Sequence, residues 1–482
     1  MLFNSLEFLI FFPIVTIAYF ALPTVRHRQW LLLLASTLFY MAFIPAYALI
    51  LYGTIIVDYF AGLMIAKSEG RARRAWLAAS IVANVGCLAV FKYCNFAIDN
   101  VNDLLSIAGS ATRMPLVELT LPVGLSFHTF QAMSYTIEVY RGNQKSERSF
   151  LVYALYVMFY PQLVAGPIER PQNIIHQLKE LHPFDAERVT RGLRLMLWGF
   201  FKKVVVADRL AVIVSAVYGA PGKFPGPILA AATFAFAIQI YADFSGYSDI
   251  ALGAAEVMGV KLMTNFRQPY MSQSVGEFWS RWHISLSTWF RDYLYIPLGG
   301  NRVGPMRRRL NLLITFLVSG LWHGANWTYV IWGGLNGLFL VGETMVLTPG
   351  RARTPGLKGT LRIVATVTLI CITWIFFRAN TVHDAFTVLS RLPTGLELLA
   401  HPRAFVGQLI QLAVEWKRFT ITVLGVVVVL SVDALAVHRR SHATELLAGL
   451  HWRGRWATYF ALTAVIVLGG IFGRQQFIYF QF

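Results

Sequence analysis

Apolar stretches of about 20 residues recur along the whole chain, and they constrain its fold more than any other feature. A helix of about 20 residues, rising about 1.5 Å per residue, crosses a hydrocarbon core of roughly 30 Å. Because lipid offers the backbone no hydrogen-bond partners, the predicted class is all-α. We expect about twelve transmembrane helices, near residues 6–22, 30–44, 47–66, 75–92, 121–139, 190–216, 226–258, 310–327, 328–347, 362–378, 417–437 and 456–473.

The composition supports an integral membrane protein, since 56% of the 482 residues are hydrophobic and only 14% are charged. The net charge of +18 would suggest a nucleic-acid partner in a soluble chain. The basic residues instead lie in short connections between apolar segments, where they mark the cytoplasmic side of a membrane. We therefore expect contact with membrane lipid and no nucleic-acid partner.

Basic residues fall on alternate connections, which predicts the topology. The connections expected in the cytoplasm carry Arg26 and Arg28; Lys67, Arg71, Arg73 and Arg74; Arg141, Lys145 and Arg148; Arg351, Arg353 and Lys358; and Arg439, Arg440, Arg453 and Arg455. Both termini are then extracytoplasmic. The segment 6–22 has no basic residue before it, so we expect a first membrane helix and not a cleaved leader.

Three other stretches depart from simple membrane crossing. The stretch 150–167 is broken by Pro161 and Pro167 and is predicted to be a re-entrant excursion buried in protein. The polar stretches 168–188 and 261–309 are expected to lie along the membrane surface. Without a long linker or an internal repeat, residues 1–482 are predicted to form a single domain. We infer no disulfide and no metal site from the spacing of Cys87, Cys94 and Cys371.

The tetrapeptide Leu321-Trp322-His323-Gly324 places an imidazole inside an apolar run. His323 follows Arg309 by 14 residues, so a helix would carry it roughly 20 Å into the membrane. Gly320 and Gly324 have the spacing that lets a second helix approach closely. A buried neutral ring can act as a general base, although it can equally donate to a carbonyl of a neighbouring helix.

A second histidine lies in the segment 277–293, whose pattern predicts one amphipathic helix. Trp282, Leu286 and Trp289 form its apolar stripe, and His283 flanks that stripe near the predicted cytoplasmic surface. The alternative is an interfacial histidine packed among aromatic side chains.

Buried carboxylates also occur in a predicted membrane segment. Asp243 and Asp249 are six residues apart, so a continuous helix would point them in different directions and they are not expected to act as a paired acid and base. A break at Gly246 would change this. A structural polar network and a cavity lining both remain open for these residues, and for the helical stripe of Gln131, Ser134, Tyr135 and Glu138.

The chain resembles the membrane-bound O-acyltransferase family in several segments. These are residues 278–287 (FWSRWHISLS), 291–293 (RDY), 321–324 (LWHG), 1–5 (MLFNS), 121–127 (LPVGLSF), 162–168 (QLVAGPI), 241–249 (YADFSGYSD) and 477–480 (FIYF). The resemblance implies transfer of acetyl from cytoplasmic acetyl-CoA, a substrate and not a bound cofactor, toward an acceptor across the bacterial inner membrane. It also implies that His323 is the catalytic histidine and that His283 is a second one.

With this resemblance we expect the fold to bring the two histidines together around a central tunnel. Asn326, Trp327 and Trp332 are candidate donors to the tetrahedral oxyanion. Another group, Arg302, Arg307 and Arg308, is expected to attract the phosphates of coenzyme A, although positive-inside topology alone would place these arginines there.

The acceptor is expected to be an extracellular polysaccharide such as alginate, reached through separate periplasmic acetyltransferase proteins. Cellulose and peptidoglycan are alternatives. A transporter would also contain buried polar residues, and a non-enzymatic scaffold of an acetylation system is a third hypothesis.

Overall fold

A computed structural model of the chain describes residues 1–164, 166–346, 353–441, 443–472 and 478. Every regular element within these ranges is helical, which confirms the all-α prediction. Contacts divide the chain into two compact units. The first unit comprises Met1–Leu193 and Ala251–Met263, and the second comprises Arg194–Ile250 and Thr264–Phe482. The prediction of a single domain over residues 1–482 stays a prediction.

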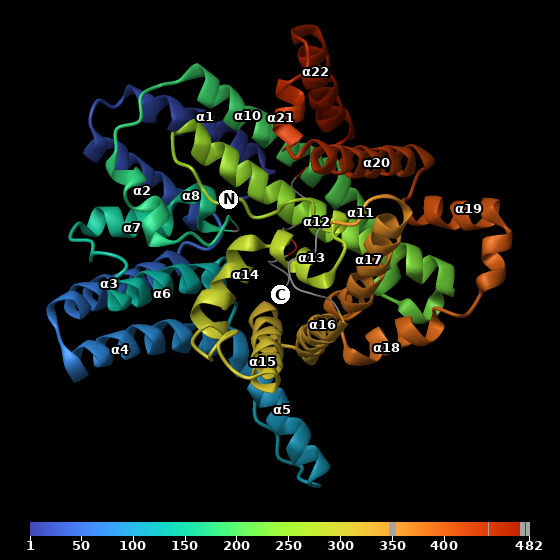
Figure 1. Cartoon of the computed structure of the whole chain (residues 1–482), viewed down its shortest axis with the longest axis horizontal. Coiled ribbons are helices and arrows are strands. Elements are labelled where there is room, and N and C mark those ends of the chain that lie inside the picture. The colour runs from blue at the N-terminus through green and yellow to red at the C-terminus, as the bar shows by residue number, and fades with distance from the viewer. Residues whose placement is uncertain (165, 347–352, 442, 473–477, 479–482) are drawn as a thin grey trace. The chain divides into compact units, whose positions relative to one another are not determined.

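The first unit contains helices α1 to α9 and the beginning of α10 (Figure 1). Their bounds are α1 Leu6–Ala21, α2 Val25–Met41, α3 Tyr47–Lys67, α4 Gly70–Leu88, α5 Cys94–Ile107, α6 Leu125–Arg141, α7 Phe150–Met158, α8 Tyr160–Leu163, α9 Pro171–Ile174 and α10 Ala186–Phe200. Two short elements, η1 Ala89–Tyr93 and η2 Gln177–Lys179, lie between them.

The second unit contains the remaining helices, with the end of α12 belonging to the first unit. Their bounds are α11 Asp208–Tyr218, α12 Gly226–Val257, α13 Val275–Arg281, α14 Ile284–Phe290, α15 Pro305–His323, α16 Trp327–Val346, α17 Gly356–Arg378, α18 Val382–Arg391, α19 Pro402–Leu412, α20 Trp416–Arg439, α21 Ala443–Ala448 and α22 Trp452–Gly469. Five short elements are η3 Phe201–Ala207, η4 Pro221–Lys223, η5 Pro269–Met271, η6 Arg291–Tyr295 and η7 Leu396–Ala400.

Six helices in the described residues are long and apolar enough to cross a membrane: Tyr47–Lys67, Gly70–Ile107, Gly226–Val257, Trp327–Val346, Gly356–Arg378 and Trp416–Arg439. They establish the multi-pass character of the protein. The other predicted crossings are helical but shorter or less apolar, so the count of about twelve remains a prediction.

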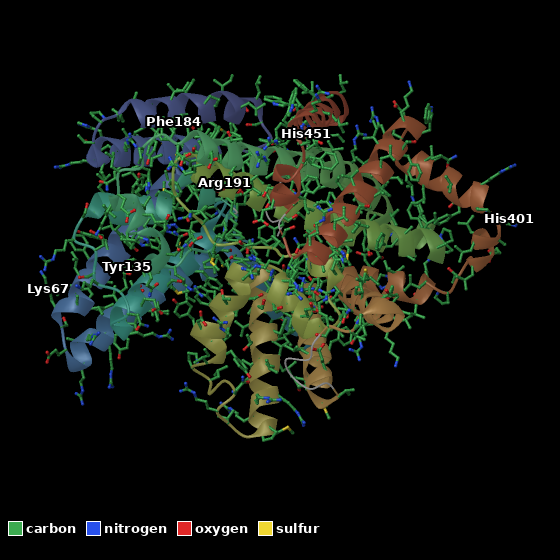
Figure 2. All side chains as sticks on the ribbon, turned by 45° about the horizontal axis from the view of Figure 1, so that its top comes forward. Lys67, Tyr135, Phe184, Arg191, His401 and His451 are labelled. Atoms are coloured by element: carbon green, nitrogen blue, oxygen red, sulfur yellow. The ribbon has the colours of Figure 1, made fainter. Side chains whose placement is uncertain are left out.

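In the first unit, α3, α4 and α6 lie side by side (Figure 1), and a buried polar cluster joins them. Asp58 accepts hydrogen bonds from Ser80 at 2.5 Å and from Asn84 at 2.8 Å. Figure 2 shows Tyr135 among the packed side chains of this unit, whereas Lys67 lies at the outer end of α3. Because such polar contacts are made between helices, they fix the pairing of otherwise apolar surfaces.

The predicted polar stripe on α6 makes hydrogen bonds to neighbouring segments. Gln131 donates to the Tyr156 carbonyl, and the Tyr135 hydroxyl accepts from the backbone of Glu147. Glu138 accepts from Gln172 at 2.8 Å. These bonds favour the polar-network interpretation of the stripe.

The broken stretch after α6 is buried within the first unit, as predicted. Helices α7 and α8 meet at Phe159, and Pro161 occupies the first turn of α8, where a missing backbone N–H costs nothing. Residues from Val152 to Val164 are buried, so this irregular backbone is enclosed by protein.

In the second unit, the prediction that Asp243 and Asp249 diverge is confirmed, because α12 is continuous and they meet different lysines. Asp243 lies 2.6 Å from Lys203, and Asp249 lies 2.7 Å from Lys202. The suggested break at Gly246 is wrong. A Cβ at Gly246 would lie 2.8 Å from the Gly199 carbonyl oxygen, so this glycine allows a close approach of two backbones.

Candidate functional site

His323 is the last residue of α15, at the point where α15 and α16 pack most closely. A Cβ at Gly320 would lie 2.3 Å from the Tyr329 carbonyl oxygen, and one at Gly324 would lie 2.1 Å from the Tyr329 ring. The close approach predicted from the spacing of these two glycines is therefore confirmed. It encloses His323, which is 5% exposed.

The backbone of α15 fixes the tautomer of His323. Its Nδ1 lies 2.6 Å from the Ser319 carbonyl oxygen, one helical turn earlier. A carbonyl oxygen only accepts, so Nδ1 carries the proton of the neutral ring and Nε2 keeps its lone pair. The ring is thereby held with Nε2 as its proton acceptor.

His283 occupies a break in the chain where one helix was predicted. The segment 277–293 forms α13, which ends at Arg281, and α14, which begins at Ile284, followed by η6. His283, which lies between them, has φ 43° and ψ 56°. This is a left-handed backbone conformation that residues other than glycine rarely adopt. The expectation of one continuous helix is therefore wrong.

His283 packs among aromatic side chains, as the alternative interpretation expected, and its depth in the membrane stays a prediction. Its ring is 1% exposed and packs edge-on against Phe244, with 4.6 Å between the ring centroids. Phe266 stacks near it at 6.4 Å. The residues around the break are buried in the second unit, so this part of 261–309 is covered by protein, and its position along the membrane surface stays a prediction.

Asn265 determines both the break and the orientation of His283. Its Oδ1 accepts from the Ser285 backbone N–H at 3.2 Å and from the Ser285 hydroxyl at 2.9 Å. A backbone N–H must donate, which identifies this atom as the amide oxygen. His283 Nδ1, 3.1 Å from the same oxygen, is then the protonated nitrogen, and its Nε2 is the acceptor.

The two histidines are 40 residues apart in the sequence, but the fold brings them close enough for a charge on His323 to affect the pKa of His283. Burial lowers the pKa of His283 well below its ordinary value, and positive charge on His323 would lower it further. A neutral ring with a fixed tautomer is the form that can accept a proton near neutral pH.

Among the three candidate oxyanion donors, Trp332 is the one that contacts His323. The two rings are 4.7 Å apart, and the buried Nε1–H of Trp332 donates to no acceptor within the described ranges. Trp327 is 53% exposed, while Asn326 donates to the Asn380 carbonyl and accepts from Thr328 at the start of α16. Trp327 therefore lies at the surface, and Asn326 bonds the backbone at the start of α16.

A mainly apolar cavity of about 230 Å³ lies one turn from His323. Ser319, whose carbonyl holds His323, lines it, as does Trp279, which packs 5.7 Å from Trp332. The other lining residues are Gly276, Leu286, Ser287, Phe290, Arg291, Tyr295, Leu312, Thr315, Phe316 and Leu340. The mainly apolar lining suits a small apolar group.

Arg302, Arg307 and Arg308 lie at the opposite end of α15 from His323. Arg302 and Arg307 are exposed, and Arg308 is half-buried. The helical distance from Arg308 to His323 is about 22 Å at about 1.5 Å per residue. Their predicted role in binding coenzyme A stays a prediction.

The sequence also matches known proteins. The model of the membrane-bound O-acyltransferase family matches residues 140–381. The chain is 39% identical over 388 residues to the probable alginate O-acetylase AlgI of Pseudomonas aeruginosa, covering 80% of this chain and 74% of the relative. It is 34% identical over 422 residues to a peptidoglycan O-acetyltransferase of Helicobacter pylori, covering 81% and 79%. A teichoic acid D-alanyltransferase of Streptococcus thermophilus is 30% identical over 232 residues, 45% of this chain and 56% of that relative.

Proposed function

Because the chain belongs to the membrane-bound O-acyltransferase family, we propose that it moves acetyl from cytoplasmic acetyl-CoA across the inner membrane for O-acetylation of extracellular alginate. The enzyme class itself follows from the family and from the O-acetyltransferase relatives. The donor, the direction and the polymer are the parts proposed here.

One observation carries the chemistry: the tautomer of His323 is fixed by the Ser319 carbonyl, which leaves Nε2 as an acceptor in a buried site. In the proposed reaction Nε2 takes the proton of an acceptor hydroxyl as its oxygen attacks the thioester carbonyl carbon. The tetrahedral intermediate then expels the sulfur, which receives the proton from His323. The products are an acetyl ester and a free thiol.

The intermediate carries a negative oxygen that needs a donor. The Trp332 Nε1–H is supported for this role by its burial, its contact with His323 and its lack of another acceptor in the part of the chain that the structure describes. A donor already desolvated before the reaction needs no reorganisation when charge develops.

His283 is proposed to act on the donor side. Its Nδ1 is held by Asn265, and its neutral ring offers a small polar edge among aromatic side chains. We assign it the alignment of the incoming thioester, while His323 faces the hydroxyl of the polymer or of an intermediate carrier. Separate periplasmic acetyltransferase proteins would complete the transfer to the polymer.

Alginate is preferred as the polymer because the relatives named for alginate O-acetylation are up to 39% identical to this chain. Peptidoglycan is the second candidate, supported by the 34% identity to a peptidoglycan O-acetyltransferase over 81% of this chain. The two are distinguished by which polymer loses acetyl esters when the gene is removed.

The test replaces His323 with asparagine, which can still donate to the Ser319 carbonyl but cannot act as a base. We expect release of thiol from acetyl-CoA by the purified protein, and acetylation of the polymer in cells, to fall about 100-fold or more. His401→Asn is the matched control, since His401 is an exposed histidine of the same unit (Figure 2).

Unchanged acetylation by His323→Asn at an equal protein level would overturn the proposed role of His323. Acetylation that continues in cells while the purified wild-type protein consumes no acetyl-CoA would instead favour a scaffold or a transporter.

A further inference from the structure

A second cavity of the second unit, about 690 Å³ in volume, is lined by four arginines. We call it the arginine pocket: Arg267, Arg281, Arg353 and Arg440, with Thr264, Gln268, Ser280, Ala436, Val437, Ser441 and Glu445. Glu445 is the one carboxylate in this lining. The lining therefore has a clear excess of positive charge.

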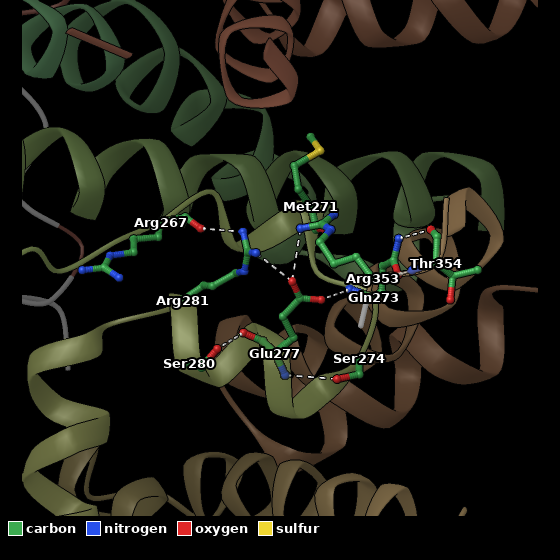
Figure 3. A network of polar contacts seen from close by, with 9 residues as sticks. All are labelled: Arg267, Met271, Gln273, Ser274, Glu277, Ser280, Arg281, Arg353 and Thr354. Atoms are coloured by element: carbon green, nitrogen blue, oxygen red, sulfur yellow. Dashed lines mark hydrogen bonds and ion pairs between the residues drawn. The ribbon is translucent and has the colours of Figure 1, made fainter. Parts of the chain in front are cut away.

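Two of the arginines are held in place by Glu277. Its Oε1 lies 2.7 Å from Arg281 and 3.1 Å from Arg353, and its Oε2 accepts from the backbone of Gln273 (Figure 3). Arg353 also donates to the Met271 carbonyl at 2.7 Å. These bonds pre-orient two guanidinium groups, which reduces the ordering cost of binding an anion.

The other two arginines keep their charge available. Arg267 and Arg440 form no ion pair with any residue that the structure describes, and Figure 3 shows the Arg267 side chain pointing away from Glu277. Burial lowers the pKa of Arg281; Glu277 opposes this shift, and the positive charges of Arg353 and Arg267 add to it. The cluster thus contains mutual repulsion that an anion would relieve.

The arginine pocket shares its walls with the histidine site. The Arg267 backbone N–H donates to the Arg281 carbonyl at 3.0 Å, and the Ile284 N–H donates to the Asn265 carbonyl at 2.9 Å. These two hydrogen-bonded backbone segments therefore carry Arg267 and Arg281 on one side. On the other side, through Asn265, they orient His283. A ligand in the pocket would lie a few residues from the segment that positions His283.

Positive-inside topology explains why basic residues occur in these connections. It does not explain why four arginines meet in the arginine pocket. The four arginines come from three separate stretches, around 267–281, at 353 and at 440. Retention on the cytoplasmic side needs only their presence near a membrane boundary. Their convergence on one concave site with serine and threonine hydroxyls matches the donor geometry that phosphate oxygens accept.

We propose that the arginine pocket binds the phosphate groups of a ligand, with Arg267 and Arg440 as the principal contacts. Phosphate of this kind comes from a nucleotide-bearing thiol such as coenzyme A or from an anionic lipid headgroup. Assignment to the acyl donor rests on the proposed function, whereas phosphate binding itself does not.

The test uses the full-length protein in nanodiscs and three single variants. Arg267→Gln and Arg440→Gln remove one contact each without breaking an ion pair among the described residues, and Arg439→Gln is the matched control. Arg439 is exposed, adjacent in sequence and outside the pocket lining. Binding of free coenzyme A and of pantetheine, which has no phosphate, is measured by calorimetry.

Loss of one arginine–phosphate contact should weaken coenzyme A binding about 10-fold or more, with the effect shrinking at high salt. Pantetheine binding should not change in any variant, and Arg439→Gln should match the wild type. This pattern identifies the nucleotide phosphate. If coenzyme A binding is equal in all proteins, the phosphate must come from a lipid headgroup. Phosphatidylglycerol should then stabilise the wild type and Arg439→Gln more than phosphatidylcholine does, and this difference should be lost in Arg267→Gln and Arg440→Gln alone.

The absence of both effects would overturn the proposal. Repeating the coenzyme A titration with His323→Asn separates this proposal from the proposed function. Binding that persists without acetyl transfer in that variant assigns the phosphate contacts to the pocket and the chemistry to His323. If the wild type binds coenzyme A through Arg267 and Arg440 but never transfers acetyl, the proposed function fails while the pocket stands.

Discussion

Replacing Gly333 with alanine should separate α15 from α16 and disable the histidine site. A Cβ at Gly333 would lie 2.3 Å from the Phe316 carbonyl oxygen and 3.1 Å from the Gly320 Cα. Ordinary contacts begin near 3.4 Å, so the backbones must move apart by about 1 Å, because neither obstacle is a flexible side chain.

The magnitude follows from two opposing terms. Overpacking of this kind costs about 1–3 kcal/mol, while alanine gains about 0.5–1 kcal/mol over glycine inside a helix. The net loss of stability is therefore modest. The loss of activity should be larger, because Trp332 precedes Gly333 and its ring must stay 4.7 Å from His323; a misplacement of about 1 Å can cost about 100-fold in rate.

Gly334→Ala is the control, since it makes the same chemical change one residue later in α16. Its Cβ would meet only a Leu317 methyl group, at 3.4 Å. We expect full activity and slightly higher stability from Gly334→Ala. Both variants are compared by acetyl transfer and by thermal unfolding in the same detergent. Equal activity of the Gly333→Ala and Gly334→Ala proteins would refute the role assigned to the close approach of these helices.

Two further predictions concern a hydrogen-bond donor and a buried carboxyl group. Trp332→Phe keeps the aromatic packing but removes the N–H, so kcat should fall about 100-fold with little change in KM; an unchanged kcat would exclude Trp332 as an oxyanion donor. Burial raises the pKa of Glu169 from 4.5 to about 7, against opposing hydrogen bonds from Asn173 and Met263. The folded protein then holds this proton more tightly than the unfolded chain, so stability should fall by about 3 kcal/mol as pH rises from 4.5 through 7. Glu169→Gln should lack this slope in unfolding experiments at several pH values, and an identical slope in both proteins would contradict the assignment.

Much of the helical framework is predictable because apolar length alone defines a membrane helix. The predicted segments 47–66 and 226–258 agree closely with Tyr47–Lys67 and Gly226–Val257. The crowding around His323 was predictable too, since Gly320 and Gly324 carry a local signal for close helix packing. These features depend on residues within one or two helical turns.

The break at His283 could not be predicted, because the local pattern fits a helix. Trp282, Leu286 and Trp289 have helical spacing, and the interruption comes from Asn265, 18 residues before His283. No property of Asn265 in the sequence indicates that its amide will bind Ser285 and His283. The arginine pocket is hidden for the same reason, since its members meet only after folding.

The left-handed backbone of His283 places an energetic cost at the histidine that we propose acts on the donor side. Such a conformation costs a residue other than glycine about 1–3 kcal/mol, and asparagine tolerates it better than most side chains. An alanine variant would keep the backbone penalty while losing the ring, so its phenotype would mix misfolding with lost chemistry. Asparagine should keep the left-handed backbone and remove the imidazole, giving a less active protein in which any backbone gain is offset by lost packing against Phe244. A selection for activity should therefore retain His283, even though its backbone conformation also suits asparagine.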